Sequence, residues 1–226
     1  METFAHRGYL DKENTLVSFH NAFPRFTGIE FDVRLSKDRK PMVIHDSNLK
    51  RTHKREEVIH HTHSSDLINI GLPTLEEVLV LAHKKKKKSI VDIKVKANTD
   101  RVVEYILEYT KKHKLRLKDI ICISYTDHHK FPKGVLFWRG YRLEIPKQIE
   151  TRNYGMAVQF IGTPKGEHSI LHTLEKHDCH VNMYIREIPN QEVWDFLQYI
   201  KNQYSDRISI TVDPPMFKVL KKSKYL

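Results

Sequence analysis

Short runs of β-branched and aliphatic residues alternate along the chain with longer stretches in which apolar residues recur at helical spacing. Nine runs predict strands, at residues 4–6, 29–34, 42–45, 90–95, 120–124, 135–138, 157–161, 181–186 and 208–213. Helical spacing follows Thr74, continues from Thr99 and recurs from Val193. Strands that alternate with helices along a whole chain are typical of a parallel sheet covered by helices. The pattern predicts an α/β fold, and 226 residues suit a (β/α)8 TIM barrel formed as one domain over residues 1–226.

The nine predicted strands exceed the eight that such a barrel contains. We therefore expect one of them to lie outside the barrel. Residues 47–72 show no clear element and are interpreted as a small insertion after the third predicted strand. After the insertion, Thr74 and Glu77 have the spacing of a capping box, which predicts the start of a helix.

Charged residues alternate with apolar ones inside three of the predicted strands. Glu30 and Asp32 share one face of the second strand, and Asp92 and Lys94 share one face of the fourth. His45 ends the third predicted strand in the same manner. An edge strand facing water would explain one such strand but not three. If the apolar faces pack under the helices, the charged faces point into the barrel.

Carboxylates buried inside a barrel repel one another and require a compensating positive charge. Glu30, Asp32 and Asp92 all offer hard oxygen ligands, which suit Mg²⁺ or Ca²⁺ rather than Zn²⁺. The sequence therefore predicts one divalent cation held by these three residues.

Two histidines, one arginine and one lysine are expected at the same end of the barrel. His6 and His45 end predicted strands, and the carboxyl ends of barrel strands converge on the catalytic face. Arg7 follows His6, and Lys94 shares the face of Asp92. A carboxylate-bound metal ion, two imidazoles, an arginine and a lysine form a suitable receptor for a phosphodiester.

Seven motifs occur in a fixed order between residues 6 and 79. They are His6-Arg7-Gly8, Glu13-Asn14-Thr15, Glu30-Phe31-Asp32-Val33, Lys37-Asp38, His45-Asp46, Leu49-Lys50-Arg51-Thr52 and Leu72-Pro73-Thr74-Leu75-Glu76-Glu77-Val78-Leu79. Together they resemble the glycerophosphodiester phosphodiesterase family, within the phospholipase-C-like phosphodiesterase barrels.

The resemblance implies hydrolysis of glycerophosphodiesters to glycerol phosphate and an alcohol. It implies that His6 and His45 are the general base and acid, with His6 favoured as the base, and that water or a glycerol hydroxyl attacks. It assigns the metal ion to Glu30 and Asp32 with a third acid, and phosphate contacts to Arg7 and Lys94. It also places Glu13 and Asn14 near the site, and Tyr184 is expected where the family carries a tryptophan.

The third acid is usually Glu in this family, and the matching residue here is Asp92. Related sphingomyelinase-D-type barrels use Asp there, so a sphingomyelinase-D-like or lysophospholipase-D-like activity on a lysolipid is an alternative. A catalytically decayed barrel that serves as a basic binding module for lipid or nucleic acid is a second alternative. The intact set of acids and histidines argues against a decayed barrel.

The formal net charge of +11 is concentrated in two places. Lys84 to Lys88 form a run of five, and the C-terminal segment adds Lys218, Lys221, Lys222 and Lys224; without these nine the net charge would be +2. Both segments are candidates for peripheral contact with an anionic membrane. No signature of a specific nucleic-acid partner accompanies them. The sequence shows no signal peptide or membrane-spanning run and only two cysteines, so we expect a cytoplasmic location.

Overall fold

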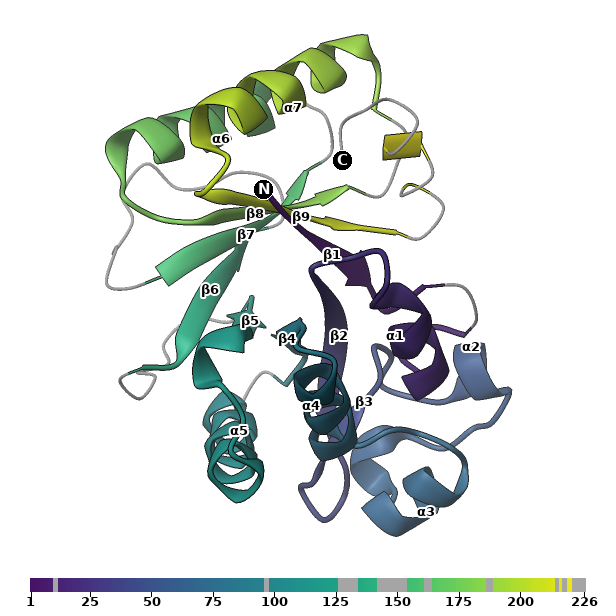
Figure 1. Ribbon diagram of the computed structural model, residues 1–226. Coiled ribbons are helices and arrows are strands. Elements are labelled where there is room, and N and C mark those ends of the chain that lie inside the picture. Colours follow the sequence, from purple (N-terminus) through teal and green to yellow (C-terminus); the bar gives the residue numbers. More distant parts are fainter. Residues whose placement is uncertain are drawn as a thin grey trace.

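The computed structural model describes residues 1–9, 12–95, 98–125, 134–141, 154–160, 164–185, 189–213, 216 and 219–220. Eight parallel strands form a closed ring, in which β1 pairs with both β2 and β9 (Figure 1). They are β1 (Glu2–His6), β2 (Gly28–Leu35), β4 (Lys88–Ile93), β5 (Ile120–Ser124), β6 (Leu136–Tyr141), β7 (Tyr154–Phe160), β8 (Val181–Ile185) and β9 (Ile208–Val212). The predicted TIM barrel is confirmed.

The ninth predicted strand lies outside this ring. β3 (Pro41–Val43) pairs antiparallel with the end of β2, with Val33 opposite Val43. The strand predicted at 42–45 is therefore shorter than expected. It pairs with the last residues of β2 and is not one of the eight barrel strands. This turn back along β2 brings the residues after Val43 down toward the middle of β2, where the Ile44 N–H donates to the Asp32 carbonyl oxygen over 3.0 Å.

The helices cover the outside of the ring (Figure 1). They are α1 (Leu16–Ala22), α4 (Leu75–Lys84), α5 (Thr99–His113), α6 (Pro164–Lys176) and α7 (Gln191–Tyr204), with a 3-10 turn η2 (Leu117–Asp119) before β5. The capping box predicted at α4 is present, since the Thr74 hydroxyl accepts from the Glu77 N–H and the Glu77 carboxylate accepts from the Thr74 N–H. Helix predictions starting near residues 74, 99 and 193 are thus confirmed.

The insertion between β3 and α4 is structured, contrary to the expectation that residues 47–72 carry no element. It holds α2 (Lys50–His53), a 3-10 turn η1 (Ile59–His61) and α3 (Ser64–Asn69). Helices this short are too brief to show a clear periodicity, and packing rather than propensity stabilises them. The insertion has an apolar core of its own, formed by Met42, Ile44, Leu49, Ile59, Leu67 and Leu72.

Asp38 ties the turn between β2 and β3 to the insertion. Its carboxylate accepts from the Ser36 hydroxyl over 2.7 Å, and from the Ser64 N–H and hydroxyl over 2.8 and 2.7 Å. Partial burial opposes ionisation, but these donors outweigh it and hold the pKa of Asp38 well below its usual range.

Asp38→Ala is expected to lower the free energy of unfolding by about 2 kcal/mol at pH 7, because three donors lose a charged acceptor. Urea unfolding measures this, and Glu56→Gln is the control, since Glu56 lies in the same insertion and forms an exposed ion pair with Lys50. Because the stability from a lowered carboxyl pKa is complete only above the unfolded pKa, the Asp38 contribution should diminish progressively as the pH falls below about 4. Equal stability of Asp38→Ala and wild type at pH 7 would contradict this assignment.

Buried hydrophobic side chains fill the interior of the ring below its carboxyl end. They are Phe4, Ile90, Ile121, Ile123, Trp138, Ala157 and Tyr184. The barrel is therefore a packed core rather than a pore, and it also encloses a hydrogen-bonded group of buried polar side chains, Asn182, Ser209 and Thr211.

Candidate active site

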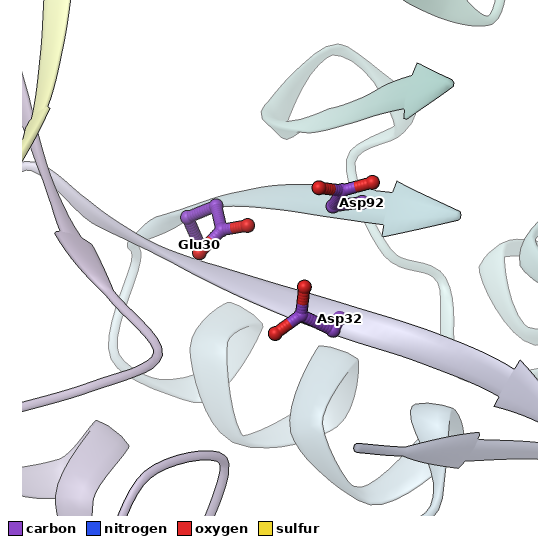
Figure 2. A group of neighbouring side chains, drawn as sticks. All are labelled: Glu30, Asp32 and Asp92. Carbon is purple, nitrogen blue, oxygen red and sulfur yellow. The ribbon is translucent and has the colours of Figure 1, made fainter. Parts of the chain in front are cut away.

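Three carboxylates from two adjacent strands meet at the carboxyl end of the barrel (Figure 2). On β2, Ile29, Phe31 and Val33 pack outward into the core beneath the helices, which turns Glu30 and Asp32 inward. Asp92 lies on β4, directly paired in register with Asp32. One oxygen from each of the three residues lies within 4.8 Å of the others, and all three side chains are buried.

The pKa values of these acids shift in different directions because their neighbours differ. Burial raises the pKa of Glu30 to about 7, and repulsion from Asp32 and Asp92 adds to this effect against the attraction of His6. Burial also raises the pKa of Asp92. Burial acts in the same direction on Asp32, but Lys94 and Arg7 outweigh it and lower its pKa to about 2.

Among the described residues, Asp92 Oδ1 is buried and accepts no hydrogen bond, and Asp32 Oδ1 has an ion-pair contact with Lys94 Nζ at 3.2 Å but no hydrogen bond. A buried acceptor without a partner is costly, and close carboxylates that also repel one another add to that cost. A divalent cation would satisfy both demands at once. The oxygen-only donor set fits a hard cation such as Mg²⁺ or Ca²⁺.

Two positive side chains border the acids. Arg7 Nε lies 2.9 Å from Asp32 Oδ2, and Lys94 Nζ donates to Asp92 Oδ2 over 2.6 Å and lies 3.2 Å from Asp32 Oδ1. Burial disfavours the charge of Lys94, but Asp92 and Asp32 outweigh it and raise the pKa of this ammonium. The two residues expected to contact phosphate are thus placed at the site, although each is paired with carboxylate here.

His6 ends β1 and is nearly enclosed. Its Nδ1 shares a hydrogen bond with Asp213, which follows β9, and its Nε2 lies 3.8 Å from Glu30 Oε2. Burial lowers the pKa of His6, but the charges of Glu30 and Asp213 outweigh burial and raise it. The two carboxylates therefore orient the ring and stabilise its protonated form.

His45 reaches the site by a route that differs from the one expected. It does not end a barrel strand; the antiparallel return of β3 carries it back beside Asp32. Arg34 Nε donates to the His45 carbonyl oxygen over 2.6 Å, and His45 Nδ1 lies 2.7 Å from Asp46 Oδ1. Burial lowers the pKa of His45, against the attraction of Asp32.

The three residues expected to line the site each contact one of its members. Asn14 Nδ2 donates to Asp32 Oδ2 over 3.0 Å, the Tyr184 hydroxyl donates to Glu30 Oε1 over 3.3 Å, and Arg7 Nη1 lies 3.3 Å from Glu13 Oε1. The Tyr184 ring also meets His6 edge-on, with 5.7 Å between the ring centres. The structure therefore brings all ten predicted site residues together.

Sequence analysis assigned no role in the site to Asp213, Asp46 or Arg51, although Asp46 and Arg51 occur in the motifs given above and Asp213 ends the last predicted strand. Asp213 directly follows β9, and closure of the ring places β9 beside β1 and its His6. Barrel topology could have predicted this contact, because the first and last strands of a closed barrel are neighbours and a carboxylate at the end of the last strand lies near the end of the first.

Of the two lysine-rich segments, the structure describes only the first. Lys84 to Lys88 span the end of α4 and the start of β4, which is the end of the barrel opposite the acids. Lys87 Nζ donates to the Phe26 carbonyl oxygen over 2.6 Å and Lys88 pairs with Glu2, while residues 84–86 are exposed. Lys218, Lys221, Lys222 and Lys224 lie outside the described residues. None of the described helices combines the length and apolar character that crossing a membrane requires.

Comparison with known proteins gives consistent results for sequence and fold. A model of the Glycerophosphoryl diester phosphodiesterase family matches residues 6–133, more than half of the chain. A glycerophosphodiester phosphodiesterase of Bacillus altitudinis is 29% identical over 144 residues, which are 56% of this chain and 58% of that protein. The chain thus spans a little over half the length of the curated relatives it matches.

Two solved structures share the fold over nearly the whole chain. Glycerophosphodiester phosphodiesterase from Thermotoga maritima superposes with a TM-score of 0.67 at 22% identity, covering 98% of this chain and 97% of that one. A phosphodiesterase from Oleispira antarctica, solved in complex with the product sn-glycerol-3-phosphate, gives 0.69 at 20% identity, covering 98% and 96%. At these identities the similarity establishes the fold.

Proposed function

Because the chain belongs to the glycerophosphoryl diester phosphodiesterase family, we propose that it hydrolyses glycerophosphodiesters to glycerol phosphate and an alcohol with the aid of one divalent cation. The observation that carries this proposal is the buried cluster of Glu30, Asp32 and Asp92, with His6 3.8 Å from Glu30 and His45 close enough to interact electrostatically with Asp32. The family match supports the reaction class, and the cluster supports the requirement for a metal ion.

Glu30, Asp32 and Asp92 are proposed to hold Mg²⁺ or Ca²⁺. When bound, the ion would polarise a phosphoryl oxygen as a Lewis acid and offset the charge that develops during the reaction. Arg7 and Lys94, already at the edge of the cluster, bind the remaining phosphoryl oxygens of the substrate. Three carboxylates and one diester carry four negative charges, which a divalent ion, Arg7 and Lys94 balance.

His6 and His45 are proposed as the general base and the general acid, respectively. Each ring is held at Nδ1 by a carboxylate, Asp213 for His6 and Asp46 for His45. A carboxylate at Nδ1 favours the tautomer that carries the proton there and leaves Nε2 to exchange a proton with the substrate. His6 removes a proton from the attacking hydroxyl, which belongs to water or to the glycerol of the substrate, and His45 protonates the leaving alkoxide.

Soluble diesters are the proposed substrate class, ahead of the sphingomyelinase-D-like or lysophospholipase-D-like alternative. The exposed lysines at 84–86 lie at the amino ends of the strands, whereas the carboxylates lie toward the carboxyl ends. A membrane bound by these lysines would face the wrong end of the barrel. Hydrolysis of glycerophosphocholine and lysophosphatidylcholine at equal concentration tests this, and faster release of choline from the lysolipid would reverse the ranking.

Removal of divalent ions with EDTA is expected to lower the hydrolysis rate by about 100-fold, because Arg7 and Lys94 alone leave the developing charge incompletely balanced. Added Mg²⁺ or Ca²⁺ should restore the rate, and the ion that restores it at the lower concentration identifies the preferred metal. Circular dichroism before and after chelation separates loss of the ion from loss of the fold. Full turnover in EDTA would contradict the proposed role of the carboxylates.

A further inference from the structure

Arg51, on helix α2 of the insertion, contacts two carboxylates of the site through all three nitrogens of its guanidinium group. Its Nη1 and Nη2 donate to the two oxygens of Glu13 over 2.9 and 2.5 Å, and its Nε donates to Asp46 Oδ2 over 2.6 Å. These three bonds join segments that are distant in sequence: the loop after β1, the chain after β3, and the insertion.

Both carboxylates have a second partner in the proposed catalytic machinery. Glu13 also faces Arg7, whose Nη1 lies 3.3 Å from Glu13 Oε1. Asp46 also holds His45, whose Nδ1 lies 2.7 Å from Asp46 Oδ1. The result is a continuous chain of alternating charge that runs from Arg7 through Glu13, Arg51 and Asp46 to His45.

We propose that Arg51 is a positioning residue that couples Arg7 and His45 by fixing Glu13 and Asp46. This inference rests on the function proposed above. A planar guanidinium group presents donors in a rigid fork and bridges two carboxylates with defined geometry, whereas a lysine ammonium is a point charge on a flexible stem. Arg51 therefore does more than neutralise charge: it sets the direction from which Asp46 receives the His45 N–H.

Arg7 and His45, at the two ends of this series of charged contacts, depend on Arg51 to different degrees. Arg7 has a second anchor, since its Nε lies 2.9 Å from Asp32 Oδ2. His45 is exposed over about a third of its side chain, and its Nδ1 is held by Asp46. Loss of Arg51 should therefore disturb proton transfer by His45 more than substrate binding by Arg7, and kcat should respond more than KM.

Arg51→Lys is the informative variant because it keeps the charge and removes the fork. We expect kcat for glycerophosphocholine to fall about 30-fold with less than about a threefold change in KM, the size of effect typical of residues that orient a catalytic group. Arg55→Lys is the matched control, since Arg55 lies in the same insertion and pairs with Glu57 away from the site. Arg55→Lys should stay within about twofold of wild type.

A second measurement does not depend on activity. In ¹⁵N-histidine NMR spectra, with the His45 signals assigned by their loss in His45→Gln, wild type should show the Nδ1–H tautomer of His45, and Arg51→Lys should show a mixture of tautomers. Arg51→Gln repeats both measurements if circular dichroism shows that the lysine variant is misfolded.

The outcomes separate this inference from the proposed function. Wild type that hydrolyses no diester would contradict the proposed function, while the NMR comparison would still test the coupling. Unchanged kcat and tautomer in an active Arg51→Lys enzyme would overturn the inference. So would a fall in kcat without a tautomer change, or a rise in KM alone, because either result would place the effect of Arg51 outside His45.

Discussion

Replacement of Asp32 by Asn should lower kcat/KM for a glycerophosphodiester by at least about 1000-fold, a loss of about 4 kcal/mol of transition-state stabilisation. Asp32 lies at the centre of the site, where Arg7, Lys94 and Asn14 all contact it. The amide keeps the size of the side chain but removes the negative charge that pairs with Arg7 and Lys94, and it replaces one of the three proposed carboxylate ligands with a neutral amide oxygen.

Steady-state kinetics measures the expected loss of activity, and titration calorimetry with Mg²⁺ and Ca²⁺ measures the expected loss of metal binding. Asp195→Asn makes the same chemical change on the exposed surface of α7 and should leave both unchanged. Glu13→Gln is a second comparison, because it removes a charge near Arg7 without removing a proposed ligand. Tight metal binding and near-full turnover by Asp32→Asn would refute the carboxylate site.

The sequence was sufficient to predict the acid cluster because β2 obeys a simple rule. Alternation along a strand sends Glu30 and Asp32 to one face and Ile29, Phe31 and Val33 to the other, and both faces of a barrel strand are buried. Burial forces the charged face into the interior, where parallel register sets Asp92 beside Asp32. The positions of the acids follow from local pattern and barrel closure alone.

His45 shows where the same reasoning fails. Its expected place rested on the carboxyl end of a barrel strand, but the strand before it is antiparallel and lies outside the ring. Short apolar runs give no indication of strand direction, because pairing partners are set by tertiary contacts. His45 still arrives beside Asp32 because the turn between β2 and β3 is tight, which the residue pattern did not specify.

The helices inside the insertion and the ion pairs of the site could not be predicted from the sequence, for related reasons. Helices of four and six residues carry too few positions to show a period. The four-residue α2 has no apolar residue, and α3 contributes only Leu67 to the cluster that contains Met42 and Ile44. Charge pattern identified Arg7 and Lys94 as cations of the site, but side-chain geometry alone reveals that Asp32 and Asp92 pair with them.

Substitution of the two histidines should separate base from acid. His6→Ala and His45→Ala are each expected to lower hydrolysis of glycerophosphocholine by about 1000-fold, within the range for loss of a general acid or base, while metal binding persists.

The leaving group decides which histidine is which. A p-nitrophenyl diester releases a phenolate that needs little protonation, so His45→Ala should lose less than about tenfold on this substrate if His45 is the acid. His6→Ala should lose as much on the activated diester as on the natural one, because the attacking hydroxyl still needs a base. The opposite pattern would exchange the two roles, because a good leaving group restores the hydrolysis rate only of the variant that has lost the general acid. Near-full turnover of glycerophosphocholine by either variant would remove that histidine from the mechanism.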